Sequence, residues 1–345
     1  MAVEAIRIGT KALRPHKALH SAFFEMRSVL TNDPFDYVDL WLRRQHQDDA
    51  LFYWRQAKAF YLASQNLTIE SSPLVLYYCF MNAAKALLTA KGVTFNPHHG
   101  VKAHSMRGPN SKTVLSNEGI RINTSGIVPA LSTYFAEAEP SNIHSLEGIL
   151  SNLVFIHRTF CLSYPRQKER FLPLKNVLFM RDTDSQEVWF QANPVDDADW
   201  PKLRSILPPE VALTAGDTKT IVSVAKISWT NGNRPSTAEF TQLQLLNQAL
   251  RRSLHYINGP QTLWYLKTVR PGRIDRHPLT LTLSAMHRLS EICRYRPSQL
   301  NSFLNGQKNW LLSEFVSMSP VQFLDEVACE MTGHQIMIPN VRVPV

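Results

Sequence analysis

Residues 78–104 combine side chains that could bind a phosphate group. Asn82 and Lys85 lie three residues apart in an apolar run, so on a helix they share a face with Tyr78. The run ends at Gly92, and three histidines follow it: His98, His99 and His104. Histidines just beyond a helix are suited to contacts with phosphate or a nucleotide. We therefore expect these six side chains to line a ligand groove, the alternative being a solvent-facing helix edge followed by a polar loop.

Metal chemistry has less support in the sequence. Two adjacent histidines rarely bind one ion well, and no cysteine or carboxylate lies close enough in the sequence to complete a tetrahedral set. Two turn-rich segments contain aspartates that could hold Mg²⁺, namely Asp182 with Asp184 and the group Asp196, Asp197 and Asp199. Solvated loops are the commoner setting for such residues. We expect no metal and no cofactor, and the absence of GxSxG, P-loop, GxGxxG and HExxH motifs excludes those enzyme classes.

Basic and aromatic residues are interleaved in the segment 264–296. The basic residues are Lys267, Arg270, Arg273, Arg276, Arg288, Arg294 and Arg296, and the aromatic residues are Trp264, Tyr265 and Tyr295. Basic side chains follow a phosphate backbone, and aromatic rings stack on bases. The segment therefore predicts a nucleic-acid-binding surface that includes the seven basic residues and Tyr295. A scattered, solvated basic face is the alternative.

The composition agrees with a globular protein that has acidic partners. The chain has 345 residues, of which 44% are hydrophobic, and a net charge of +9 that is concentrated toward its two ends. Such a bias favours nucleic acid, DNA or RNA, as a partner. The four cysteines form no CxxC pair, so we expect reduced thiols in a cytoplasmic protein. The sequence has neither a secretory signal nor an uninterrupted apolar stretch of about 18 residues, so we expect no membrane partner.

Hydrophobic periodicity and capping residues indicate the elements. Helices are predicted over 48–67 and 73–91, where Pro73 begins and Gly92 ends the second, and together they form an antiparallel hairpin. A third helix is predicted over 145–161. Runs of β-branched and aromatic residues within 170–272 predict an antiparallel sheet, and helical spacing returns from Pro278 onward.

Several of these segments carry a family resemblance. FYWRQAKAFYLAS, SPLVLYYCFMNAAKALLTAKG, the following HHG and the tail LSEICRYRPSQLNSF with NWLLSEFVSMSPVQFLDEVACEMTG resemble the YaaC-like family of bacterial proteins, over roughly residues 40–335. The hairpin is also similar to HEPN-type domains, which are helical units of ribonucleases and of bacterial defence or toxin systems. The matching segments are patterns of packing residues rather than a catalytic signature. The YaaC-like family has no settled biochemical activity, so this resemblance implies none for the chain.

The HEPN resemblance also implies a catalytic pattern, in which an arginine is followed after four to six residues by a histidine near a helix terminus. Arg14 with His20 and Arg270 with His277 have this spacing. The first pair lies outside the predicted hairpin, and Pro271 and Gly272 interrupt any helix that would present the second. These four residues are therefore candidates for catalysis, although neither pair lies in the position that the HEPN pattern would use.

We therefore expect a predominantly helical α+β protein. Its regions would be a HEPN-like helical bundle with an N-terminal extension over 1–165, a central antiparallel β segment over 166–272 and C-terminal helices over 273–345. The expected function is that of a non-catalytic, nucleic-acid-associated component of a bacterial, antiphage defence system. Two alternatives stay open, a HEPN-type ribonuclease and a scaffold that forms homodimers or binds partner proteins of such a system.

Overall fold

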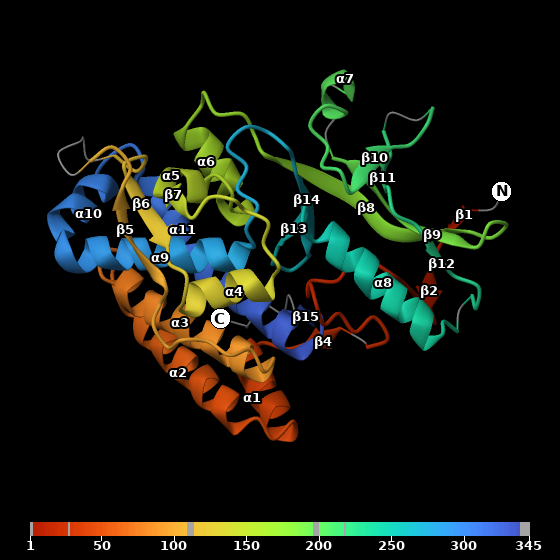
Figure 1. The fold of residues 1–345 in the computed structure, drawn as a ribbon, viewed down its shortest axis with the longest axis horizontal. Helices are drawn as coiled ribbons and strands as arrows, with labels where there is room; N and C mark the ends of the chain where they lie inside the picture. Colours follow the sequence, from red (N-terminus) through yellow and green to blue (C-terminus); the bar gives the residue numbers. More distant parts are fainter. Residues whose placement is uncertain are drawn as a thin grey trace, which may run out of the picture. The chain divides into compact units, whose positions relative to one another are not determined.

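The chain forms two units, and each is assembled from segments that are far apart in the sequence (Figure 1). The computed structural model describes residues 3–26, 28–108, 114–195, 200–216, 219–232 and 234–338. One unit, the sheet unit, comprises Met1–Leu30, Arg170–Arg273 and Gly333–Val345. The other, the helical unit, comprises Thr31–Glu169 and Ile274–Thr332.

The sheet unit is built on an antiparallel sheet that curls into a half-barrel. Its strands, in spatial order, are β10 (Val211–Leu213), β11 (Ile221–Ser223), β9 (Glu187–Pro194), β8 (Phe171–Asp182), β14 (Leu263–Lys267) and β13 (Leu254–Ile257). Strand β1 (Val3–Ala5) also pairs with β8, and β12 (Ile227–Ser228) pairs with β9. Buried and partly exposed residues alternate along the whole of β9, as expected for a strand with one face in the core.

A single long helix, α8 (Thr237–Leu250), covers the core of the sheet unit (Figure 1). Its N-terminus has a capping box in which Ser236 and Glu239 bond each other's backbone N–H groups. Burial alone would raise the pKa of Glu239, but hydrogen bonds from the backbone and side chains of Ser236 and Asn231 lower it to about 2. The apolar face of α8 packs in one cluster with residues of the sheet such as Phe190 and Tyr256.

Short elements complete the sheet unit. Strands β2 (Arg7–Ile8) and β3 (Lys11–Ala12) pair antiparallel, and β4 (Val29–Leu30) pairs parallel with β15 (Ile336–Met337). The short helix α7 (Trp200–Leu203) lies between β9 and β10 in the sequence.

The helical unit contains ten helical segments among the described residues. They are α1 (Pro34–Arg44), α2 (Asp48–Ser64), α3 (Ser72–Ala90), α4 (Ile127–Tyr134), α5 (Leu146–Leu150), the 3₁₀ turn η1 (Val154–Ile156), α6 (His157–Ser163), α9 (Pro278–Tyr295), α10 (Pro297–Leu304) and α11 (Asn309–Thr332). Helix α3 packs against α2, α9 and α11, and Phe80 of α3 stacks on Phe323 of α11 with ring centroids 4.3 Å apart. A small antiparallel sheet of β5 (Val101–Ser105), β6 (Glu118–Ile122) and β7 (Ile143–Ser145) adjoins them.

The predicted helical hairpin is confirmed. Helices α2 and α3 lie side by side (Figure 1), Pro73 lies in the first turn of α3, and Gly92 follows it with a φ of 66°. The prediction of helix from Pro278 is confirmed by α9, and antiparallel strands do fill much of 170–272.

The predicted fold class, a predominantly helical α+β protein built on a HEPN-like helical bundle, is wrong. The structure is mixed α/β, with 42% helix and 19% strand. Strands β5, β6 and β7 lie in a region predicted as loop and helix, and they are too short to show a clear two-residue period. The predicted third helix is broken into α5, η1 and α6, because Asn152 turns its side-chain amide back to the carbonyl of Gly148.

The arrangement of the units also differs from the three consecutive regions expected over 1–165, 166–272 and 273–345. The first 30 residues belong with the central sheet, and the helices after Arg273 belong with the N-terminal helices. Contacts between distant segments decide this division, and such contacts leave no local pattern in the sequence.

We predict that Phe80→Ala destabilises the protein strongly. Phe80 is fully buried, so its removal leaves a cavity and costs about 3–5 kcal/mol in the free energy of unfolding. Phe52, which is 59% exposed on the neighbouring α2, serves as the control, and Phe52→Ala should change the free energy of unfolding by about 0.5 kcal/mol or less. Urea unfolding measures both, and equal losses for the two variants would contradict the packing described.

Candidate functional site

A groove of about 280 Å³ lies in the helical unit, between α3, the loop that follows it and α9. We call it the histidine groove. It is lined by Leu74, Tyr77, Tyr78 and Met81 from α3, by Pro97, His98 and His99 from the loop, and by His287, Ser290, Glu291, Arg294 and Tyr295 from α9. The α9 residues follow one another at intervals of three, one, three and one, so they share one face of that helix.

Two glycines fix the position of the histidine loop. Gly100 and Gly126 approach so closely that a Cβ on Gly126 would lie 2.4 Å from the Cα of Gly100, and both have positive φ angles. The carbonyls of His98 and His99 accept hydrogen bonds from Ile127 and Val128, at 2.8 and 3.1 Å. The loop backbone therefore docks on the first turn of α4, where free N–H groups are available.

Two histidines face each other in the groove. The ring centroids of His99 and His287 are 4.7 Å apart, and the ring of Tyr77 meets that of His287 edge-on at 5.1 Å. His287 is buried, whereas His99 is exposed. Burial, followed by the nearby His99 and Arg288, lowers the pKa of His287 to about 3, so its ring is neutral at physiological pH.

The polar atoms beside His287 are incompletely paired. Nδ1 of His287 lies 3.7 Å from Oε2 of Glu291, and within the described residues it has no hydrogen-bond partner. Glu291 itself is bound by Arg288, at 3.1 Å. A buried polar atom without a partner is rare in a folded protein unless a water or ligand completes it.

The structure brings together half of the six residues predicted to line a ligand groove. Tyr78, His98 and His99 line the histidine groove. The side-chain amide of Asn82 is buried and donates to the carbonyl of Tyr78 at 2.8 Å. The ammonium group of Lys85 lies 5.4 Å from the ring centroid of Tyr53 on α2, outside the groove. His104 lies on β5 opposite Gly119 and is likewise not part of the groove lining.

The predicted basic stretch contributes two residues to the same groove, Arg294 and Tyr295. Both are exposed, Tyr295 by 67%. The guanidinium carbon of Arg294 lies 5.0 Å from the ring centroid of Tyr295, a cation–π arrangement. Two independently predicted sets of residues, the histidine loop and the end of the basic stretch, therefore meet at one place.

The remaining basic residues of the stretch that belong to the helical unit are held in internal networks. Arg276 is buried and pairs with Glu137 at 2.8 Å. Arg288 is also buried and pairs with Glu118, which Arg296 contacts at 2.8 Å from a more exposed position. Glu118 lies far upstream on β6, and these arginines and their hydrogen bonds lower the pKa of its carboxyl group against the effect of burial.

Three basic residues of the stretch belong to the sheet unit, and one of them is buried. Lys267 is only 1% exposed. Arg273 donates to the carbonyl of Lys267 at 2.9 Å and to Ser253 Oγ at 3.0 Å. The carbonyl of Arg270 accepts from the guanidinium of Arg170 at 3.1 Å. The stretch is thus not one continuous basic surface.

The histidines of the two candidate Arg–His catalytic pairs make contacts that stabilise the fold. Nδ1 of His20 is 2.9 Å from the side-chain nitrogen of Gln248, in a non-helical segment of the sheet unit. His277 caps α9 by accepting from the N–H of Leu279, and its ring stacks on Phe135 at 3.8 Å. Arg14 belongs to the sheet unit with His20, whereas Arg270 and His277 belong to different units.

The acidic candidates have no metal-binding arrangement among the residues that the structure describes. Asp182 accepts from the backbone N–H of Asp184 in the turn after β8, at 2.9 Å. Asp196, Asp197 and Asp199 lie outside the described residues. In the described part of the chain, no three His, Cys, Asp or Glu side chains are grouped so as to hold a metal ion.

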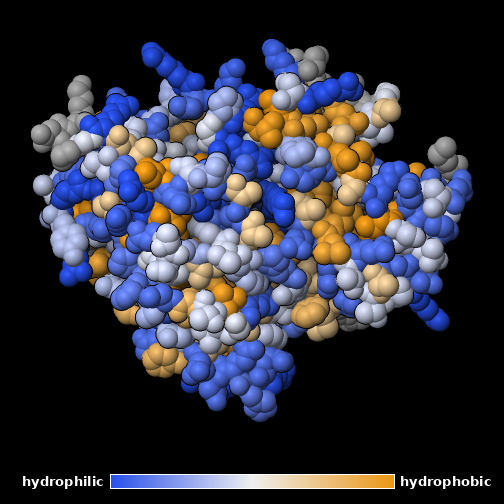
Figure 2. All heavy atoms as spheres, in the orientation of Figure 1, coloured by the Kyte–Doolittle hydropathy of each residue, from blue (hydrophilic) through white to orange (hydrophobic). Residues whose placement is uncertain are grey.

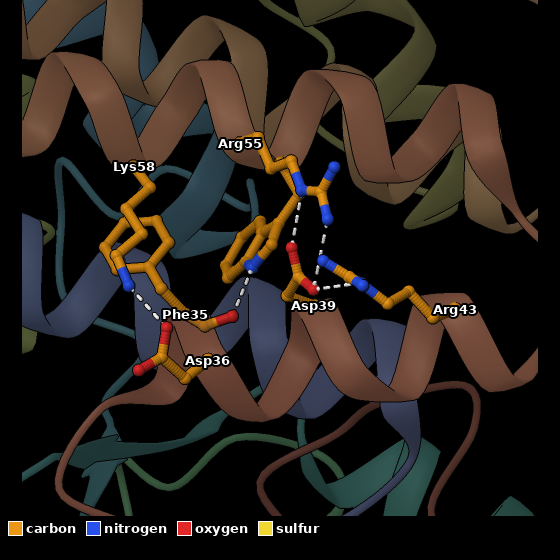
Figure 3. Close-up of a pocket in the computed structure, with 7 residues that line it drawn as sticks. Phe35, Asp36, Asp39, Arg43, Arg55 and Lys58 are labelled. Carbon is orange, nitrogen blue, oxygen red and sulfur yellow. Dashed lines mark hydrogen bonds and ion pairs between the residues drawn. The ribbon is translucent and has the colours of Figure 1, made fainter.

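A second hollow of the helical unit, of about 470 Å³, lies between α1 and α2 (Figure 3). Its charged side chains face one another across the two helices. Asp39 binds Arg43 at 2.7 Å and Arg55 at 2.6 Å, while Lys58 binds Asp36. Lys58 also binds Asp33, at 2.9 Å, so that three carboxylates offset the three cations. We therefore interpret the hollow as a set of ion pairs that joins α1 to α2 rather than as a binding site.

Hydrophobic residues also gather on the surface, over the part of the sheet unit that holds β8, β10 and β11 (Figure 2). Val195, just after β9, and Val224, just after β11, are 47% and 62% exposed. Exposed apolar side chains of this number are normal on folded proteins and do not by themselves mark a site.

Sequence reasoning missed His287, Tyr77 and Glu291. A signal for the α9 residues does exist, since Met286, Leu289 and Ile292 form an apolar stripe in the sequence of that helix. The neighbouring stripe then contains His287, Glu291 and Arg294, a polar line beside an apolar one.

We predict that His287 stays neutral down to about pH 5. Because the folded protein holds its pKa near 3, below the ordinary value of 6.5, the unfolded chain binds the proton first and stability falls as the pH drops from about 6.5 toward 3. Imidazole C–H resonances recorded between pH 8 and 5 measure this, with His287→Gln to assign the signal and free imidazole as the internal pH standard. A His287 resonance with a midpoint near 6.5 would contradict the burial described.

No described helix is long and apolar enough to cross a membrane.

Comparisons with known proteins identify the family to which the chain belongs. Neither the curated proteins nor the solved structures contain a match to this chain. A family model described as YaaC-like Protein matches residues 21–331, a range that includes every residue of the histidine groove. The chain therefore belongs to the family of YaaC-like proteins.

Proposed function

We propose that the histidine groove binds single-stranded nucleic acid, and that the protein acts as a nucleic-acid-associated component without cleaving the strand. The observation that carries the proposal is the meeting of Arg294 and Tyr295 with His98 and His99 in one groove. A basic side chain, a stacking ring and hydrogen-bonding imidazoles are the groups that a phosphate and a base require.

Arg294 supplies the phosphate contact. It is exposed on the last turn of α9, and in the described part of the chain no carboxylate pairs with it. Its position over the ring of Tyr295 restrains the guanidinium group and leaves its N–H edge for an anion. His98 and His99, exposed on the opposite wall, can donate further hydrogen bonds to the same phosphate.

Tyr295 supplies the stacking platform. About two thirds of this residue is exposed, so its ring is accessible to a base. Stacking of a base on such a ring contributes about 1–3 kcal/mol and does not depend on the base. A groove of about 280 Å³ is at the small end of ligand sites, so it would hold one nucleotide of the strand.

The electrostatics favour binding over cleavage. General acid–base catalysis of phosphodiester cleavage works best with groups whose pKa lies near the operating pH. His287, the buried member of the facing pair, has a pKa of about 3, so at neutral pH it is a weak base and is not protonated to act as an acid. We therefore prefer a binding site to a ribonuclease. The expected homodimer, the partner proteins and the antiphage defence setting stay predictions.

We predict that Arg294→Gln and Tyr295→Ala each weaken binding of a fluorescein-labelled oligo(U) or oligo(dT) 12-mer by about tenfold. The losses follow from one charge-assisted contact and one stacked base, each worth about 1–3 kcal/mol. Fluorescence anisotropy as a function of salt measures the affinity, and Arg294→Gln should also lower the slope of log K against log [salt] by about 0.7.

Matched controls separate the groove from general surface effects. Arg121→Gln removes an exposed arginine from β6, and Trp310→Ala removes an aromatic residue that is 53% exposed on α11. Both should bind as the wild type does. Absence of binding to any DNA or RNA, binding without salt dependence, or equal losses in the variants and their controls would refute the proposal.

A further inference from the structure

The largest of the three hollows lies in the sheet unit and has no part in the proposed function. Its volume is about 530 Å³. It is lined by Lys11, Ala12, Leu13, Arg14 and His16 around and after β3, by Phe23, Phe24, Met26 and Ser28 before β4, by Pro260, Gln261, Thr262 and Trp264 at the turn into β14, and by Gln335 and Met337 at β15. All four segments belong to the sheet unit.

The charged side chains of this lining are both basic, Lys11 and Arg14. The imidazole of His16 also lines the hollow, and the lining contains neither aspartate nor glutamate. Lys11 donates to Ser28 Oγ at 3.0 Å, and in the described part of the chain neither Lys11 nor Arg14 is bound by a carboxylate. Burial and the neighbouring Arg14 lower the pKa of Lys11, as expected where positive charges gather.

Further basic residues that are not part of the lining lie near His16. His16 is 4% exposed, and after burial the causes that lower its pKa to about 3 are, in order, the charges of Arg251, Lys11, Lys17 and His334. The imidazole of His16 is therefore neutral, and the surroundings attract an anion.

His16 also has a donor without a partner. Its Nδ1 accepts the backbone N–H of Ala18 at 3.0 Å, so the proton of the neutral ring lies on Nε2. Nε2 is buried and has no hydrogen-bond partner within the described residues. A buried donor left in this way is rare without a water or ligand to accept from it.

The rest of the lining is apolar and aromatic. Phe24 and Trp264 are buried, whereas Phe23 and Met26 are 44% and 51% exposed at the rim. Aromatic and methionine side chains adapt to flat, ring-bearing ligands. Binding sites for small molecules combine such an apolar body with a few polar groups at one end.

We propose that this pocket, the basic pocket of the sheet unit, binds a small organic anion in which a phosphate, sulfonate or carboxylate group is attached to an apolar ring system. The anionic group lies toward Lys11 and Arg14, and the ring system packs on Phe23, Phe24 and Trp264. The inference is independent of nucleic-acid binding at the histidine groove, since no residue is shared between the two linings.

The test uses the fluorescent anion 1-anilinonaphthalene-8-sulfonate and its neutral analogue N-phenyl-1-naphthylamine as probes of the full-length protein. We expect saturable binding of the anion, competition by inorganic phosphate, and an affinity at least tenfold weaker in Lys11→Gln/Arg14→Gln. The neutral probe should bind that variant and the wild type equally well, because only the charged contact has been removed.

Two controls make the outcome specific. Lys175→Gln/Arg252→Gln removes the same charge from exposed positions of the sheet unit outside the pocket and should leave both probes unaffected. Thr262→Trp adds a ring to the pocket wall and should exclude both probes, with thermal unfolding to verify that it folds. Arg294→Gln should keep the affinity for the anion, which separates this proposal from that of the histidine groove. Equal losses in the two double variants, or undiminished binding to Thr262→Trp, would overturn it.

Discussion

The burial of α3 is the constraint on which the helical unit depends. Ala83, Ala84 and Ala86 are fully buried, and such small side chains let α2, α9 and α11 pack closely around one helix. The partly exposed residues Leu74 and Tyr78, spaced by one helical turn, are left on the groove side. The wall of the histidine groove is therefore an edge of α3 that neighbouring helices cover only in part, for example where Phe60 of α2 stacks on Tyr78.

The other walls of the groove depend on α3 and on one close backbone contact. Helix α9 packs along α3 and presents His287 and Arg294 from one face. The loop that carries His98 and His99 is held by the approach of Gly100 to Gly126, where a side chain on either residue would meet backbone atoms at less than 3 Å. A groove whose walls are fixed in this way needs little rearrangement to bind a ligand, which lowers the free-energy cost of binding.

The sequence predicts those parts of the structure that have local signals. The helical hairpin follows from apolar periodicity, Pro73 and Gly92, and both helices occur close to the predicted bounds. Strand β1 has no such signal, because its partner β8 lies more than 160 residues away and the pairing covers only three residues. The predominantly helical fold class fails for the same reason, since short strands become a sheet only through partners that local patterns do not identify.

The candidate sites also contain some features that local sequence signals predict and others that depend on distant partners. Arg288 and Arg294 lie on one helix and have the same charge, yet one is buried and the other exposed. The difference arises from Glu118, 170 residues upstream of Arg288, which pairs with the buried arginine. A run of basic residues thus indicates binding only after its internal partners are known, and here Arg294 and Tyr295 are the pair that reaches the groove.

Photo-crosslinking tests the central claim, nucleic-acid binding in the histidine groove, most directly. An oligonucleotide containing 5-iodouridine would be irradiated with the wild-type protein, and crosslinked peptides would be identified by mass spectrometry. We expect crosslinks at Tyr295 and in the peptides that contain Tyr77, Tyr78, His98 or His99. Crosslinks confined to the sheet unit, or spread evenly over exposed aromatic residues such as Phe52 and Trp310, would contradict the account.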